Sequence, residues 1–148
     1  MSQGIHIQCK GILPGKAKGR ALVLRDSISF QGEIDEEGKI VVRGHPYVGE
    51  SVAGKVLIYP EAKGSSGGCM MLRLLAKRGK KPAAIVNTRN LDPNLVEGAI
   101  LADVPMVCFP QRDPYEIIST GDLVEVDGQT GILTKLSDRT HNSRCVST

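Results

Sequence analysis

Hydrophobic and polar positions change their spacing along the chain, and each spacing predicts an element. Loose alternation over residues 5–13 and 20–25 is typical of strands. Between them, residues 14–19 combine proline, glycine and lysine, which predicts a turn or loop. Residues 27–42 predict a hairpin or a long loop with its turn at residues 35–38, where acidic residues precede a glycine.

The middle of the chain contains short apolar runs of the kind found in buried strands. Residues 52–60 form the strongest strand candidate and end at a proline. Residues 82–87 and 104–110 are shorter, and they are as continuously apolar as strands of a parallel sheet that is covered on both faces. We therefore expect three parallel strands in the region from about residue 52 to about residue 110.

Helical spacing lies between these apolar runs. Over residues 69–78 the apolar positions recur every three or four residues, with basic residues on the other face and Gly79 placed to end the helix. Residues 91–103 predict a second short helix with Pro93 near its start. The order is thus strand–helix–strand–helix–strand, which predicts an α/β fold with a central, mostly parallel sheet.

The end of the chain adds a hairpin and a polar tail. Residues 122–136 alternate on both sides of a "DGQTG" turn, which predicts a hairpin flanking the parallel sheet. The last dozen residues are polar. We expect one domain over residues 1–136 and a disordered tail over residues 137–148.

Composition narrows the function classes. The 148 residues include 41% hydrophobic and 24% charged residues, an ordinary balance for a globular protein, and only 3% aromatic residues. The formal charge of +3 is scattered, and no basic cluster alternates with aromatic residues, so we expect no nucleic-acid partner. No apolar run approaches the roughly 20 residues that span a bilayer, so we expect no membrane association.

The cysteines indicate a reducing compartment. Cys9, Cys69, Cys108 and Cys145 are widely spaced, and none forms a C-x-x-C pair. This spacing argues against a metal site within the chain, and without a signal peptide it also argues against a disulfide framework. We expect reduced thiols in the cytoplasm.

The most informative loop is "KGSSGG", which follows the strongest strand and precedes the first helix. Ligands of open α/β sheets bind beyond the carboxyl ends of the strands, and a helix start presents unpaired N–H groups to an anion. The loop therefore suits a carboxylate or a phosphate. The alternative is purely structural: Ser66 caps the helix and the glycines turn the chain.

A nucleophile motif also matches this loop. "GSSGG" satisfies G-x-S-x-G, which would make Ser66 the nucleophile of a hydrolase. Such an enzyme needs a histidine later in the chain, and the only one is His141 in the polar tail. The chain is also short for that fold, so this hypothesis is disfavoured.

Several segments in a fixed order resemble a known family. They are "SISFQGEID", "HPYVGESVAGKVLIYP", "KGSSGG", "KPAAIV" and "GAILADVPMV", and together they resemble the small subunit, or swivelling domain, of the aconitase X family over residues 9–135. The resemblance implies a swivelling β/β/α domain. It also implies a role in dehydration, since two-subunit archaeal members act on mevalonate 5-phosphate and bacterial members act on cis-3-hydroxy-L-proline.

The resemblance implies roles for the residues of the loop. In the wider aconitase superfamily the first serine of a Gly-Ser-Ser turn removes the proton beside a carboxylate, and Ser65 matches that position. Gly64, Ser66, Gly67 and Gly68 are then the candidate substrate-binding residues. Aconitases proper continue with Arg-Glu where this chain has Gly67-Gly68, so the charge of the substrate must be met by other groups.

The resemblance also implies a partner and a cofactor outside this chain. Iron or an iron–sulfur cluster is expected in a large aconitase X catalytic subunit, with no cofactor in this chain. The hypothesis is a heterodimeric hydro-lyase in which this chain supplies the base and the bound substrate is a small anion. The alternative is a non-catalytic module that binds an anion or a partner.

Other polar residues near the predicted strand ends are weaker candidates. His45 lies in a loop before the strongest strand, and a lone loop histidine is more often structural than catalytic. We expect Cys69 to be a small buried residue at the helix start. Three cations and one polar segment stand where they could meet an anion: Arg43, Lys63, Arg89 and residues 87–89.

Overall fold

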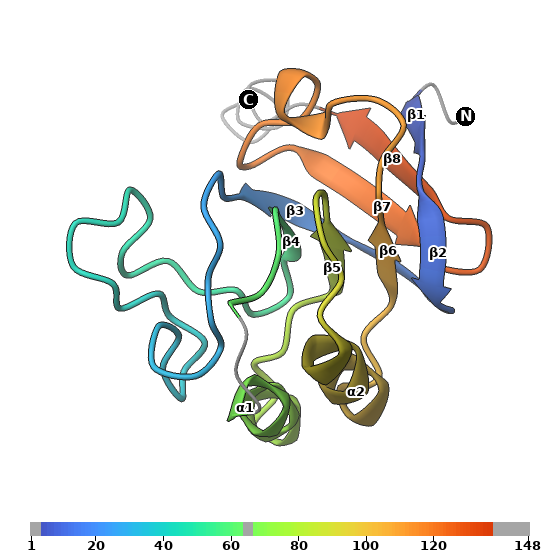
Figure 1. Cartoon of the computed structure of the whole chain (residues 1–148). Helices are drawn as coiled ribbons and strands as arrows, with labels where there is room; N and C mark the ends of the chain where they lie inside the picture. Colours follow the sequence, from blue (N-terminus) through green and yellow to red (C-terminus); the bar gives the residue numbers. More distant parts are fainter. Residues whose placement is uncertain (1–3, 64–66, 138–148) are drawn as a thin grey trace.

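The computed structural model describes residues 4–63 and 67–137, and within them eight strands form one sheet with two α-helices packed on it (Figure 1). Gly64, Ser65, Ser66 and residues 138–148 lie outside the described residues, and of the tail expected over residues 137–148 only Ser137 is described, as the end of the last strand. The elements are β1 (Ile5–Gln8), β2 (Lys10–Leu13), β3 (Lys16–Val23), β4 (Val56–Tyr59), α1 (Gly67–Lys77), β5 (Ala84–Asn87), α2 (Pro93–Ala102), β6 (Met106–Cys108), the 3-10 helix η1 (Pro114–Glu116), β7 (Leu123–Asp127) and β8 (Ile132–Ser137).

The centre of the sheet is parallel, as the sequence predicts. The strand order is β1-β8-β7-β3-β4-β5-β6-β2, and β3, β4, β5 and β6 pair in parallel. The helices α1 and α2 connect β4 to β5 and β5 to β6. The predicted C-terminal hairpin is β7 and β8, which pair antiparallel and flank β3.

The two ends of the strand order are joined by one residue of the chain. β1 pairs with β8 and β2 pairs with β6, and only Cys9 separates them. The amide of Cys9 donates to the carbonyl of Gly131 at 2.8 Å, in the turn between β7 and β8. The predicted single strand over residues 5–13 is therefore two strands, and the chain bends at Cys9 so that the sheet curves around its own interior.

Side chains of the central strands point alternately into two apolar layers. In β4, Val56 and Ile58 face a cluster enclosed by the curved sheet, whereas Leu57 and Tyr59 face the helices. The helix side contributes Leu72 and others, so the arrangement has two sheet layers and one helix layer. This β/β/α architecture confirms the expected swivelling-domain fold.

The prediction of a loop over residues 14–19 is wrong, because β3 begins at Lys16. Its first residues pair with β7, from Lys16 opposite Asp127 to Gly19 opposite Val124. Gly19 looks like a strand breaker in the sequence, but a side chain there would place its Cβ 2.6 Å from the carbonyl oxygen of Gly54. The glycine thus permits a close approach between β3 and the turn before β4, which sequence spacing alone does not reveal.

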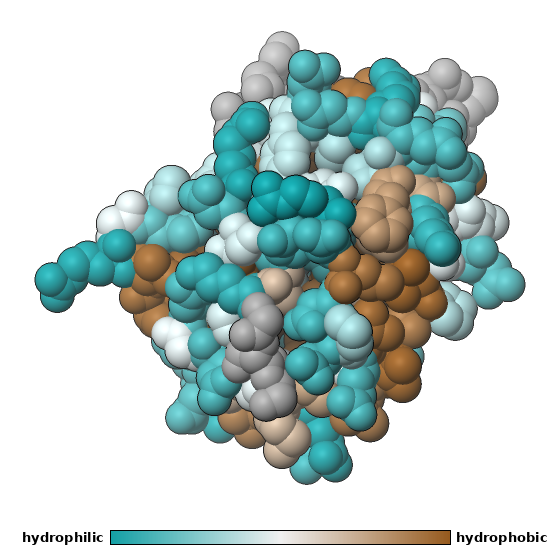
Figure 2. All heavy atoms as spheres, viewed as in Figure 1, coloured by the Kyte–Doolittle hydropathy of each residue, from teal (hydrophilic) through white to brown (hydrophobic). Residues whose placement is uncertain are grey.

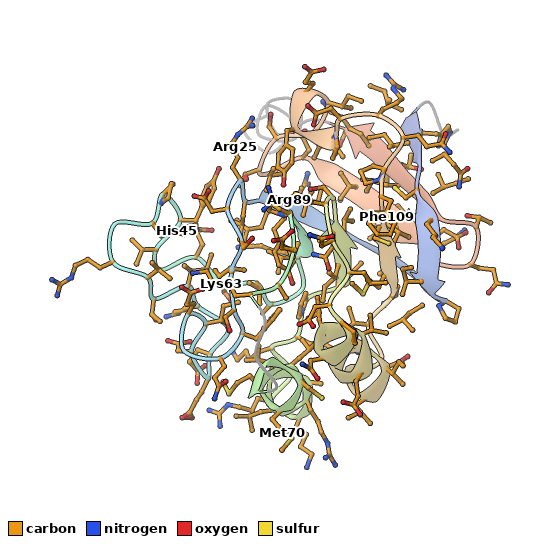
Figure 3. All side chains as sticks on the ribbon, in the orientation of Figure 1. Arg25, His45, Lys63, Met70, Arg89 and Phe109 are labelled. Carbon is orange, nitrogen blue, oxygen red and sulfur yellow. The ribbon has the colours of Figure 1, made fainter. Side chains whose placement is uncertain are left out.

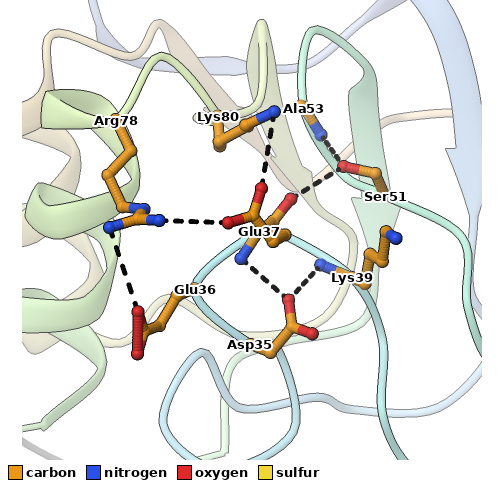
Figure 4. A network of polar contacts seen from close by, with 8 residues as sticks. All are labelled: Asp35, Glu36, Glu37, Lys39, Ser51, Ala53, Arg78 and Lys80. Atoms are coloured by element: carbon orange, nitrogen blue, oxygen red, sulfur yellow. Dashed lines mark hydrogen bonds and ion pairs between the residues drawn. The ribbon is translucent and has the colours of Figure 1, made fainter.

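The segment between β3 and β4 is a long loop with the predicted turn at its centre. Gly38 has a φ of +80°, and its amide donates to the carbonyl of Asp35 at 2.9 Å. Isolated bridges join Ile34 to Ile40 and Lys39 to Ser51, in place of a regular hairpin. Figure 4 shows how this turn is tied to the end of α1 through Glu37.

Helix α1 confirms the predicted periodicity. Leu72 and Leu75 are buried, Arg73 is exposed, and Gly79 follows the helix with a φ of +72°. Helix α2 begins with Pro93 at its first position and with the Asp92 carboxylate accepting from the amide of Asn94. Among the described residues, no helix is both long and apolar enough to cross a membrane.

Candidate active site

Three loops meet where the parallel strands end. Because β3, β4 and β5 run in the same direction, residues 24–26, 60–63 and 87–90 all follow carboxyl ends at one edge of the sheet. Figure 3 shows Arg25, Lys63 and Arg89 around this edge, and hydrophilic atoms gather there on the face in Figure 2. Residues 60–63, which lead into the serine loop, and residues 87–89 therefore follow strand ends at the same edge.

Gly67 and Gly68 form the first turn of α1, and their surroundings differ. A Cβ at Gly67 would overlap the side-chain amide of Gln31, so only glycine leaves room for that side chain. A Cβ at Gly68 would meet nothing within 4 Å. Packing beside Gln31 therefore explains the glycine at position 67, whereas Gly68 faces open space at the start of the helix.

The central residues of the predicted site are not described. Ser65, the predicted base, lies outside the described residues, as do Gly64 and Ser66. The roles assigned to all five residues of the loop stay predictions. The described neighbours on both sides, Lys63 and Gly67, fix where the loop begins and ends.

Lys63 is held by a carboxylate from the long loop. Its Nζ lies 2.7 Å from Oε2 of Glu33, while Oε1 of the same group accepts from the amide of Ser29 at 2.8 Å. Partial burial raises the pKa of Glu33, but the hydrogen bonds from Lys63 and Ser29 outweigh it and lower the pKa below the usual 4.5. The charge of Lys63 is therefore largely balanced within the protein.

Arg89 is balanced in the same way. Its Nε lies 2.9 Å from Oε1 of Glu61, which also accepts from Nδ2 of Asn90 at 3.0 Å. The hydrogen bond from Arg89 is the main reason that the pKa of Glu61 is lowered. Asn87 is fully buried, and its Nδ2 contacts the carbonyl of Tyr59 at 3.4 Å, which joins the ends of β4 and β5.

Arg25 differs from the other two cations at this edge. Its guanidinium carbon lies 5.0 Å from the centre of the Tyr115 ring, and Tyr115 donates through its hydroxyl to the carbonyl of Leu24 at 2.9 Å. No carboxylate in the described part of the chain forms an ion pair with Arg25. Sequence analysis missed Arg25 and Tyr115. Arg25 could have been recognised as a candidate if the strand before it had been predicted to be parallel to the next strand, because Arg25 then lies at the carboxyl edge of the sheet.

His45 borders two adjoining cavities beside this edge. One cavity of about 360 Å³ is lined by Arg25, His45 and Tyr47 among others, and a second of about 340 Å³ is lined by His45 and Lys63 among others. The Nδ1 of His45 accepts from the amide of Tyr47 at 2.9 Å. The histidine thus shapes its loop and also faces the space between Arg25 and Lys63.

Cys9, Cys69 and Cys108, the cysteines in the described part of the chain, are buried, as expected for Cys69. Cys69 is 7% exposed at the start of α1, and its thiol lies 3.9 Å from Oε1 of Glu97. Burial raises the pKa of the Cys9 thiol to about 12, and it also raises the pKa of Cys108. Within residues 4–63 and 67–137, no three His, Cys, Asp or Glu side chains are grouped as metal ligands.

Comparison with known proteins places this architecture in a family. The family model described as the aconitase X swivel domain matches residues 6–135, which include every strand of the sheet up to Lys135 in β8. The chain belongs to the aconitase X swivel domain family. The match spans both helices and the segments that form the edge described above.

Curated relatives and a solved structure agree with the aconitase X assignment. The phosphomevalonate dehydratase small subunit of Methanocella arvoryzae is 42% identical over 86% of this chain and 98% of its own length. The protein of the same name from Methanococcoides burtonii is 38% identical over 91% of this chain and 98% of its own length. A crystal structure of aconitase X from Thermococcus kodakaraensis in its holo-form superposes with a TM-score of 0.83, at 33% identity, over 90% of this chain and 100% of that chain.

Proposed function

We propose that this chain is the small subunit of a phosphomevalonate dehydratase, a hydro-lyase in which it completes an active site with a larger subunit. The observation that carries the proposal is the match, over almost their whole length, to relatives that bear this name. The open edge formed by the ends of β3, β4 and β5 supports it, because a docking partner has access to the start of α1 there.

Ser65 is the proposed general base. A serine hydroxyl is a weak base near neutral pH, so its deprotonated form must be stabilised by nearby donors. The donors proposed for this are backbone N–H groups at the start of α1, where a helix N-terminus carries a partial positive charge. Ser65 then takes a proton from the carbon beside the substrate carboxylate, the C–H electron pair forms a double bond, and the neighbouring hydroxyl departs.

Departure of the hydroxyl is assigned to the partner. An iron centre in the larger subunit would act as a Lewis acid on the departing hydroxyl. The roles proposed for this chain are therefore to bind the anionic substrate and to remove its proton.

The decisive experiment uses the complex of the full chain with its larger subunit. Ser65→Ala should lower kcat for dehydration of mevalonate 5-phosphate by at least about 100-fold, the range of a general base, while the complex still assembles on size-exclusion chromatography. Ser66→Ala is the comparison variant: Ser66 is a candidate substrate-binding residue, so its loss should raise KM, whereas loss of the base at Ser65 lowers kcat. We also expect no turnover by the small chain alone.

Three results would contradict parts of this proposal. A Ser65→Ala complex with normal kcat removes Ser65 from the chemistry. Turnover by the isolated chain contradicts the division of labour between subunits. A complex that converts cis-3-hydroxy-L-proline and leaves mevalonate 5-phosphate unchanged replaces the proposed substrate, and a complex that converts neither supports a binding module instead of an enzyme subunit.

A further inference from the structure

We propose that Arg25 and His45 form a phosphomonoester-binding cleft, which would hold the phosphate end of the substrate in the proposed dehydratase. This inference rests on the proposed function for the identity of the ligand, and on the geometry of the cleft for its chemistry. Neither residue belongs to the serine loop.

The cleft consists of two adjoining cavities. Arg25, Asp26, His45 and Tyr47 line the cavity of about 360 Å³, and the cavity of about 340 Å³ shares Asp26 and His45 with it. The second cavity also includes Lys63, the last described residue before the serine loop. The cleft therefore extends from the beginning of that loop to Arg25.

Two donors in this cleft lack acceptors within the described residues. Arg25 has a cation–π contact with Tyr115 and no ion pair. In the neutral ring of His45, Nδ1 accepts from the amide of Tyr47, so the proton is on Nε2 and no acceptor from the described chain contacts it. A planar guanidinium and an imidazole N–H that line one cavity suit the several acceptor oxygens of a phosphate.

The supporting contacts hold these donors in place. Tyr115 is anchored by its hydroxyl to the carbonyl of Leu24, directly before Arg25, and its ring lies under the guanidinium. Lys63 is balanced by Glu33, and Asp26 adds one carboxylate to the lining. Selectivity for phosphate must therefore come from directed hydrogen bonds of Arg25 and His45 more than from a net positive field.

The length of the substrate fits this separation of roles. Mevalonate 5-phosphate carries its carboxylate and its phosphate at opposite ends. A base that acts beside the carboxylate leaves the phosphate several bonds away. Lys63, the last described residue before the serine loop, lines a cavity that shares Asp26 and His45 with the cavity lined by Arg25.

The test compares variants in the complex with the larger subunit. Arg25→Gln should raise KM for mevalonate 5-phosphate by roughly 10- to 100-fold with kcat within about threefold, and Arg25→Lys should restore part of the loss. His45→Asn should also raise KM, because its side-chain oxygen can still accept from the Tyr47 amide while the Nε2 donor is lost. Arg73→Gln, on the exposed face of α1, makes the same charge change elsewhere and should leave KM unchanged.

A second readout uses inorganic phosphate as the probe. We expect phosphate to inhibit the parent complex competitively and to inhibit the Arg25→Gln complex at least tenfold more weakly. Thermal unfolding of each variant shows whether folding is intact. A complex that turns over mevalonate 5-phosphate with unchanged KM in both Arg25→Gln and His45→Asn overturns the cleft and leaves the proposed function standing.

Failure of the proposed function gives a different result. If the parent complex does not convert mevalonate 5-phosphate, phosphate is titrated into the isotopically labelled full chain and followed by NMR. Saturable shifts of the Arg25 and His45 amides, absent in Arg25→Gln, would support a phosphate cleft with another substrate. Shifts at neither residue would overturn the cleft as well.

Discussion

At the scale of single residues, two glycines in the helices differ in their structural roles. Gly98 in α2 lies against the backbone of Cys69 in α1, and a Cβ at Gly98 would lie 2.9 Å from Cα of Cys69. Gly68 lies in α1 with open space where its side chain would be. The first glycine permits the close crossing of the helices, and the second has no such packing role.

This difference predicts opposite effects of alanine on stability. Gly98→Ala should lower the free energy of unfolding by about 1–3 kcal/mol, because backbone atoms of α1 cannot move away as cheaply as a flexible side chain. Gly68→Ala is the matched control. It should leave the free energy of unfolding unchanged or raise it by up to about 1 kcal/mol, because alanine has a higher helix propensity than glycine. Urea unfolding measures both, and an equal effect at the two positions would contradict the proposed crossing.

Sequence analysis could place residues in elements but could not find their partners. The helical spacing over residues 69–78 predicts that Leu72 and Leu75 are buried, and they are. Whether Arg25 has an ion pair depends on where Glu33 and Glu61 lie in the fold. Glu33 binds Lys63, which is 30 residues away in the sequence, and Glu61 binds Arg89, which is 28 residues away. Such long-range pairing has no local signal, so the cleft beside His45 is visible only in the fold.

At the scale of elements, the end of α1 is fastened to the turn at the centre of the long loop. Glu37 contacts Arg78 at 3.0 Å and Lys80 at 3.6 Å, while Asp35 accepts from the amides of Glu37 and Lys39 (Figure 4). The sequence predicts the turn from its acidic residues and glycine. The link to the helix comes from tertiary packing, since the two segments are about 40 residues apart.

This link predicts a dependence of stability on pH. The hydrogen bond from Arg78, followed by the charge of Lys80, lowers the pKa of Glu37 below the usual 4.5. A carboxyl whose pKa is lowered by folding stabilises the protein above its unfolded value, and this contribution is lost as the pH falls through the folded value. The contribution of Glu37 is therefore complete near neutral pH and absent in acid.

Glu37→Gln should test this directly. We expect the variant to unfold at a slightly lower temperature than the parent at about pH 7, with the difference shrinking as the pH falls below 4.5. Glu36→Gln is the control, because Glu36 lies 3.9 Å from Arg78 and contacts no other described cation within ion-pair distance. A difference for Glu37→Gln that grows in acid would have the wrong sign and would refute the argument.

At the scale of the whole molecule, stability and accessibility are divided between two regions. The central strands β4 and β5 are buried on both faces and are paired in parallel on both sides. The long loop around His45 instead has isolated turns, with Val48 53% exposed. The proposed cleft thus lies between the buried central strands and a loop that has few buried side chains.

Hydrogen exchange should reveal this division. In the isolated chain, the amides of Leu57, Ile58, Ile85 and Val86 should exchange only through global unfolding, at roughly 5–15 kcal/mol for a typical domain. The amides of His45, Val48 and Glu50 bond only within exposed turns, so they should exchange through local opening at least about 100-fold faster. If addition of the larger subunit slows exchange over residues 43–50 and leaves the exposed turn at Gln129 and Thr130 unchanged, the His45 loop faces the partner. Equal protection of both turns, or of neither, would place the partner elsewhere and separate the cleft from the subunit interface.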